Sequence, residues 1–205
     1  MLNPPSPNDL AIRYRTRGYQ VILYAGTLEP YQGLDLLVDA ASIVVRAKPQ
    51  TVFLCIGGYK AQIAELQRRA RNNAVEDHFV FLGVVGAETV QAYFMLADIL
   101  ISPRVSGINT PLKIYPYLSS GVPVLATNIR SHTQVLTSEV ALLVEPHADA
   151  IAAGILRLLE DSDLRQLLIR NARTLAQEKF SAKAYYAKVA EVYSFLEMTK
   201  ACRLS

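Results

Sequence analysis

The residues of this 205-residue chain best suited to chemistry lie in loops that follow short apolar runs. In the loop at residues 26–33, Gly26 and Gly33 bracket a turn before a predicted helix, and glycine lets a backbone approach a phosphate closely. The spacing fits neither the GxGxxG fingerprint nor a P-loop. A turn that only reverses the chain explains these residues equally well. A second pair, Gly57 and Gly58, follows another apolar run and fits a plain turn better than a ligand platform.

The most informative loop spans residues 102–113. Thr110 followed by Pro111 is typical of a helix start, with a hydroxyl cap and a proline at the first helical position. The backbone amides of Leu112 and Lys113 would then be free to bind a phosphate, and Lys113 would add a full charge. A capped helix with a solvated lysine is an equally good interpretation. Arg104 is a second candidate cation, less certain to face a ligand.

Pro116 affects the same segment. In a helix that began at Pro111, this proline would lie inside the helix, remove an amide donor and cost roughly 3 kcal/mol. The sequence therefore predicts a distorted first turn. Further along, His132 is expected to cap a surface turn rather than to face a cleft.

The elements that position these loops alternate between strand and helix. Continuous apolar runs predict buried parallel strands at residues 21–25, 51–56, 79–82, 99–102, 122–126 and 141–144. Helical spacing separates the runs, and from residue 148 onward the pattern is helical only. The Asp161-Ser162-Asp163 run and Ser181 are the expected caps of the later helices. The fold class is therefore α/β: a Rossmann-like, doubly wound, six-stranded parallel sheet with C-terminal helices. Residues 1–18 are expected to form a linker or tail, and residues 19–205 a single domain.

Composition narrows the functional classes. The chain is 51% hydrophobic and 19% charged, which suits a packed globular protein. A net charge of +3, with scattered basic residues such as Arg68, argues against nucleic acid as a partner. Cys55 and Cys202 give no framework for disulfides or a metal, and the three histidines are too far apart in sequence for a metal triad. With no apolar stretch of signal-peptide or membrane-spanning length, a cytoplasmic location is expected.

Several segments in register resemble the group-1 retaining glycosyltransferases of the two-Rossmann-domain (GT-B) class. They are the loop at 26–33, the Phe81-Leu82-Gly83 and Ala97-Asp98-Ile99 triplets, the loop at 102–113, and residues 121–127. The similarity extends over about residues 21–195. It implies the donor-binding domain of such an enzyme, with a nucleotide-diphosphate sugar as donor substrate and no separate cofactor. The nucleotide-sugar contacts that it implies are Gly26, Thr27, Gln32, Gly33, Gly57, Gly58, Val84, Thr110, Pro111, Leu112 and Lys113.

The sequence departs from the family pattern at defined positions. The family has Arg after the first loop glycine and Lys before the second, where this chain has Thr27 and Gln32. The acidic pair of the family falls on Ile108 and Pro116, so the chain resembles a divergent branch that lacks this pair. No residue of the chain is assigned as catalytic.

The resemblance also implies partners. An N-terminal acceptor-binding domain completes the active site of such enzymes and is missing from this chain, so the chain is expected to be inactive alone. Peripheral membrane association of the full-length enzyme and self-association of the chain are compatible with the resemblance. Two alternatives stay open: a non-catalytic nucleotide-binding or interaction module derived from the same fold and, less favoured, a sugar-nucleotide 2-epimerase.

Overall fold

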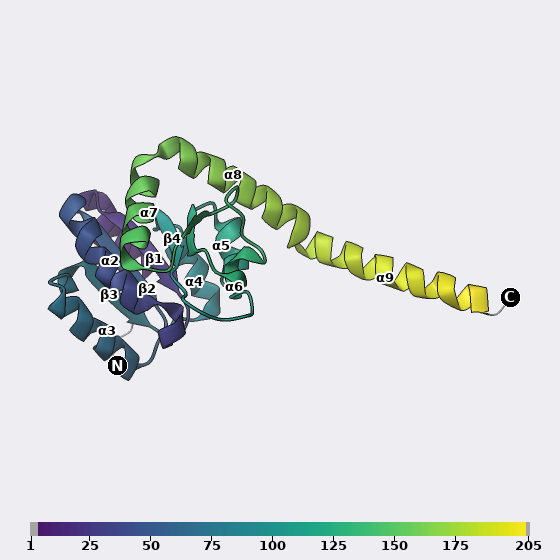
Figure 1. Ribbon diagram of the computed structural model, residues 1–205, viewed down its shortest axis with the longest axis horizontal. Helices are drawn as coiled ribbons and strands as arrows, with labels where there is room; N and C mark the ends of the chain where they lie inside the picture. Colours follow the sequence, from purple (N-terminus) through teal and green to yellow (C-terminus); the bar gives the residue numbers. More distant parts are fainter. Residues whose placement is uncertain (1–3, 204–205) are drawn as a thin grey trace.

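A computed structural model describes residues 4–203 of the protein, and its centre is one parallel sheet (Figure 1). The strand order is β3-β2-β1-β4-β5-β6. The strands are β1 (Gln20–Ala25), β2 (Thr51–Ile56), β3 (Phe79–Gly83), β4 (Ile99–Ser102), β5 (Val124–Thr127) and β6 (Leu142–Val144). The helices are α1 (Pro7–Tyr14), η1 (Arg15–Arg17), η2 (Pro30–Gln32), α2 (Leu34–Ala47), α3 (Lys60–Asn72), η3 (Glu76–His78), α4 (Ala87–Phe94), α5 (Ile114–Ser120), α6 (Arg130–Thr133), α7 (Ala148–Glu160), α8 (Ser162–Lys179) and α9 (Ala182–Arg203). The predicted six-stranded, doubly wound parallel sheet is thus confirmed.

The hydrophobic core lies on both faces of this sheet. Alternate residues of β1 point to opposite faces, so Val21 and Leu23 join one apolar cluster while Ile22 and Tyr24 join the other. Helices α1, α4 and α5 cover the first face, and helices α2, α3 and α7 cover the second. Because both faces are covered, each strand reads as a continuous apolar run rather than an alternating one.

The sheet has its switch point beside β1. The chain adds β2 and β3 on one side of β1 and then returns to add β4, β5 and β6 on the other. The loops after β1 and β4 therefore meet at the carboxyl edge of the sheet, where open α/β folds bind ligands. A backbone hydrogen bond of 3.0 Å from Val105 N–H to the Tyr31 carbonyl joins them.

The N-terminal segment differs from the expected linker. Residues 7–14 form helix α1, whose Leu10 and Tyr14 are buried in the first apolar cluster. A capping box starts the helix: Ser6 Oγ accepts from the Asp9 amide at 3.2 Å, and the Asp9 carboxylate accepts from the Ser6 amide at 3.0 Å. The prediction failed because a helix of 8 residues shows too few periodic apolar positions, although Ser6, Pro7 and Asp9 carry the start signal.

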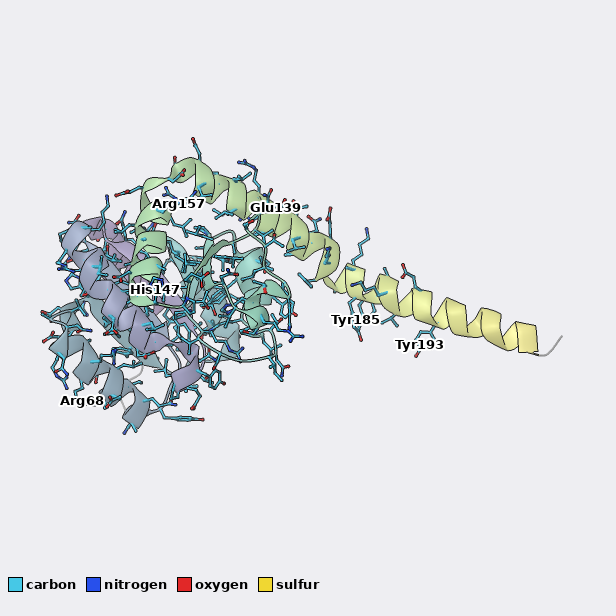
Figure 2. All side chains as sticks on the ribbon, in the orientation of Figure 1. Arg68, Glu139, His147, Arg157, Tyr185 and Tyr193 are labelled. Atoms are coloured by element: carbon cyan, nitrogen blue, oxygen red, sulfur yellow. The ribbon has the colours of Figure 1, made fainter. Side chains whose placement is uncertain are left out.

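The C-terminal helices follow the predicted caps. Asp161 Oδ1 accepts from the Leu164 amide at 2.8 Å to start α8, and Ser181 Oγ accepts from the Ala184 amide at 3.1 Å to start α9. Helix α9 extends away from the rest of the domain, with Tyr185 and Tyr193 exposed along it (Figures 1 and 2). Within residues 4–203, none of the helices combines the length and apolar character needed to cross a membrane. Self-association of the chain stays a prediction.

Helix α5 begins later than the sequence suggests. The Ile114 amide donates to the Pro111 carbonyl at 3.0 Å, which closes a turn, and α-helical geometry starts at Ile114. Pro116 therefore occupies the third helical position, where the missing amide has no intrahelical acceptor to lose. The predicted distortion before Pro116 is confirmed. The predicted cap is wrong, because Thr110 lies outside α5 and its hydroxyl donates to Gln134 Oε1 at 3.1 Å.

Candidate functional site

A cavity of about 500 Å³ opens at the carboxyl edge of the sheet, at the switch point. Seven of the predicted site residues line it: Gly26, Thr27, Gly57, Gly58, Val84, Leu112 and Lys113. The other four, Gln32, Gly33, Thr110 and Pro111, lie outside its lining. The structure thus brings the first glycine loop, the glycine pair and the start of α5 to a single cavity.

Tight backbone packing forms the β1–β3 side of this cavity. Gly57 has a φ of 112°, and a Cβ at that position would overlap the Gly26 carbonyl oxygen. The Gly57 amide donates to the Gly83 carbonyl at 2.6 Å, so the ends of three strands meet here. The glycine pair therefore has a packing role that the sequence did not predict, beside its place in the cavity wall.

Buried polar groups hold the first glycine loop, residues 26–33, in place. The Tyr24 hydroxyl donates to the Thr27 carbonyl at 2.5 Å, and Gln32 Nε2 donates to Thr27 Oγ1 at 3.4 Å. Gln32 is buried, with 8% of its surface exposed. Gly33, at a φ of 70°, packs against the Pro103 carbonyl, where a side chain would clash. Gln32 and Gly33 therefore support the loop rather than line the cavity.

Lys113 brings its side-chain amine to the cavity. Its Nζ lies 3.8 Å from the centre of the Tyr24 ring and donates to Gln32 Oε1 at 3.3 Å. Burial lowers the pKa of Lys113 well below its usual range, and the nearby Arg104 guanidinium lowers it further. Among residues 4–203, no carboxylate forms an ion pair with Lys113. An anion in the cavity would therefore gain a partner that the protein itself does not neutralise.

Backbone donors accompany this lysine. In the part of the chain that the structure describes, the amides of Leu112 and Lys113 have no hydrogen-bond partner. Both residues line the cavity, and Leu112 is 83% exposed. These donors have no protein acceptor within residues 4–203, and a turn rather than a capped helix presents them.

Arg104 has a different task from the one proposed for it. Its guanidinium donates to the Ser106 carbonyl at 2.6 Å and to the Asn109 carbonyl at 2.9 Å, and it stacks 5.0 Å from the centre of the Tyr31 ring. Arg104 does not line the cavity. It closes its own loop and contributes charge only at a distance.

His132 is buried, which corrects the expectation of a surface cap. None of its surface is exposed, and its ring bridges the ends of β4 and β5 through Ser102 and Thr127. Burial, with added repulsion from Lys113 and Arg104, lowers the pKa of His132 to about 4. Polar residues at the ends of two neighbouring apolar strands were the signal that could have found this bridge.

The sequence also missed several residues of the cavity wall. The omitted wall residues are Ala25, Ile56, Tyr59, Gln62, Val85, Val90, Phe94 and Pro116. Tyr59 and Gln62 start the helix after the glycine pair, so their position at a strand's carboxyl end was the available signal. The basic residue Arg68 points outward from α3, where it pairs with Glu65 at 2.6 Å (Figure 2). Within the described residues no group of three or more His, Cys, Asp or Glu is arranged to hold a metal.

Comparison with known proteins identifies the family. The model of the family described as "Glycosyl transferases group 1" matches residues 11–175, which is most of the chain. The chain belongs to the group 1 glycosyl transferases. The glycine loops, the cavity and Lys113 all lie within the part of this group 1 glycosyl transferase chain that the family model matches.

Curated relatives agree with this family. The D-inositol 3-phosphate glycosyltransferase of Jonesia denitrificans is 30% identical over 166 residues, covering 77% of this chain and 39% of that protein. The putative glycosyltransferase YtcC of Bacillus subtilis is 26% identical over 179 residues, covering 82% of this chain and 44% of that protein. This group 1 glycosyl transferase chain therefore spans less than half the length of these two relatives.

Solved structures share the fold. Anabaena Alr3699/HepE, in complex with UDP and glucose, superposes with a TM-score of 0.79 at 20% identity, covering 93% of this chain and 53% of that one. The C-terminal domain of the LpcC glycosyl transferase from Francisella tularensis gives a TM-score of 0.72 at 18% identity, covering 88% of this chain and 96% of that one. The chain thus corresponds in size to the C-terminal domain of a group 1 glycosyl transferase.

Proposed function

We propose that this chain binds a nucleotide-diphosphate sugar and forms the donor-binding part of a glycosyltransferase. The observation that carries the proposal is the Lys113 ammonium, which lies beside the Gly26 loop without a carboxylate partner among the described residues. The free amides of Leu112 and Lys113 add neutral donors to the same place. A diphosphate bound there would satisfy all three groups.

The remaining wall of the cavity suits a nucleoside. Gly57 and Gly58 expose backbone, while Val84, Val85 and Phe94 give an apolar surface on which a base can lie. The neighbour Alr3699/HepE was solved with UDP and glucose, and 53% of that chain shares the fold of this one. We place the nucleoside beside the Gly57 and Val84 turns and the diphosphate beside Lys113.

The chemistry of transfer would depend on charge. As the bond from the sugar to the diphosphate breaks, negative charge grows on the leaving phosphate, and a fixed cation stabilises it. Lys113 is the candidate for this electrostatic role. The acceptor site, the activity of the whole protein and a cytoplasmic location are further parts of the proposal.

A non-catalytic module is the second candidate. It is favoured by the neutral Thr27 and Gln32 beside Lys113, and by the absence of Arg104 from the cavity lining. Such a module would bind nucleotides weakly or not at all. The affinity of this chain for a nucleotide sugar separates the two functions.

Calorimetric titration with UDP-glucose and with GDP-mannose tests the proposal. We expect one of them to bind, and Lys113→Met to weaken that binding about tenfold or more, because a charge-assisted hydrogen bond contributes about 1.5 to 3 kcal/mol. In the free protein the same change should raise the free energy of unfolding, since it removes a desolvated ammonium.

Lys179→Met is the matched control, because Lys179 is exposed at the end of α8. It should leave binding unchanged. Absence of binding by both nucleotide sugars at millimolar concentration would favour the non-catalytic module instead.

A further inference from the structure

Loop 103–113 carries Lys113 into the cavity, yet its residues 103–111 belong to no helix or strand. One backbone hydrogen bond, from Val105 to the Tyr31 carbonyl, holds the loop, and its other contacts come from side chains. Arg104 does this from within the loop through its bonds to the Ser106 and Asn109 carbonyls. The other contacts come from outside, from α6 and the residue that follows it.

Gln134 contacts this loop with both ends of its amide. Its Nε2 donates to the Ile108 carbonyl at 2.8 Å, and its Oε1 accepts from the Thr110 hydroxyl at 3.1 Å. The two contacts fall five and three residues before Lys113 in the chain. Gln134 therefore fixes the second half of the loop at two points, just ahead of the turn that presents Lys113.

His132 holds the beginning of the same loop. Its Nδ1 lies 2.9 Å from the Thr127 carbonyl, which can only accept, so Nδ1 carries the proton. Its Nε2 is then an acceptor for the Ser102 hydroxyl at 2.9 Å, at the residue where β4 ends. The Thr127 hydroxyl in turn donates to the Arg104 carbonyl, so the network reaches the first residues of the loop.

We propose that Gln134 and His132 are positioning residues, which fix loop 103–113 and so hold the Lys113 ammonium where it meets an anion in the cavity. This inference rests on the proposed function for the identity of the anion. It assigns to α6 a task in binding although, among the described residues, neither Gln134 nor His132 lines the cavity. Gln134 is exposed, so it can be replaced without disturbing the core.

The test compares UDP with uridine as probes of the wild-type chain and of Gln134→Ala. Loss of positioning should weaken UDP binding about tenfold, which is about 1.4 kcal/mol, while uridine, which has no phosphate for Lys113, binds as before. On a Lys113→Met background, Gln134→Ala should have no further effect, because the two residues act through one contact. Gln67→Ala, at an exposed glutamine of α3, is the control and should change neither affinity.

Two outcomes would overturn the inference. One is an equal loss of UDP and uridine affinity in Gln134→Ala, which would indicate a general change of the cavity. The other is an additive effect in the double variant, which would separate Gln134 from Lys113.

Hydrogen exchange keeps the inference testable even if the wild-type chain fails to bind UDP, in which case the proposed function fails. The Val105 amide, which donates to the Tyr31 carbonyl, should exchange about tenfold faster in Gln134→Ala than in the wild type, while the bonded amides of Gln32 and Gly33 stay unchanged. Equal exchange of the Val105 amide in both proteins would show that Gln134 does not fix the loop.

Discussion

The two sides of the cavity are built by different means. On the side of β1, β2 and β3, backbone packs directly on backbone at Gly57, and β1 and β2 are six residues long. On the side of β4 and β5 the strands are four residues long, and side chains such as His132 and Gln134 hold an extended loop. Close packing of backbone at glycines distinguishes the first side, and side-chain hydrogen bonds to a loop distinguish the second.

This difference predicts whether a substitution will mainly change the free energy of unfolding or the binding of a ligand. Backbone packing tolerates almost no added volume, so changes on the glycine side should mainly alter the free energy of unfolding. Hydrogen bonds from exposed side chains contribute little to stability but set where Lys113 lies. Substitutions on the two sides should therefore produce different kinds of defect.

The largest effect is expected at Gly57. Gly57→Ala would place a Cβ against the Gly26 carbonyl at a φ of 112° and should lower the free energy of unfolding by about 3 to 4 kcal/mol. Urea unfolding measures this change. Gly83→Ala is the matched control, since Gly83 also has a positive φ, of 68°, but no atom within 4 Å of the added Cβ. Gly83→Ala should lower the free energy of unfolding by only about 1 to 2 kcal/mol, which is the cost of placing alanine in a left-handed conformation. Equal costs at both glycines would contradict the packing role of Gly57.

An intermediate effect is expected from acid at His132. The pKa of His132 is about 4 in the folded protein, against a usual value of 6.5, because burial disfavours the charged ring. Between these values the unfolded state binds more protons, so the free energy of unfolding should fall by about 3 kcal/mol as the pH decreases from 6.5 to 4. Denaturant titrations across this range measure the slope.

His132→Gln should remove most of this slope, whereas His147→Gln, at an exposed position, should keep it. An unchanged slope in His132→Gln would assign the acid sensitivity to other groups.

The smallest effect is expected at Thr110. If this hydroxyl capped a helix, Thr110→Val would cost about 1 kcal/mol of stability. Because it bonds to exposed Gln134 instead, the cost should stay below about 0.5 kcal/mol. Thermal unfolding measures the difference, with Asp161→Ala, at the cap of α8, as a comparison that should show the full cost.

The sheet could be predicted because strands buried on both faces are continuous apolar runs. Residues 51–56 and 99–102 were predicted with the bounds that the structure has. The α8 and α9 caps were also predicted, since Asp161 and Ser181 act within their own first turns. These features depend on residues that are close together in the chain, so they can be predicted from the sequence alone.

The remaining features depend on contacts between distant segments. Whether Thr110 caps a helix or bonds to Gln134 is decided by a partner 24 residues away, and His132 finds its partner Ser102 across 30 residues. Helix α1 is short, and just before it the Pro5 carbonyl accepts a hydrogen bond at 2.9 Å from the Tyr93 hydroxyl, 88 residues away. Patterns along the chain do not show which distant residues will be in contact.

The contact between Lys113 and the Tyr24 ring has a practical consequence for experiments in solution. The chain contains no tryptophan, so tyrosines dominate its near-ultraviolet absorption and emission. An anion that draws the ammonium away from the ring face would change the electric field on that phenol. Tyr24 would thus report optically when an anion occupies the cavity, and the protein would need no added label.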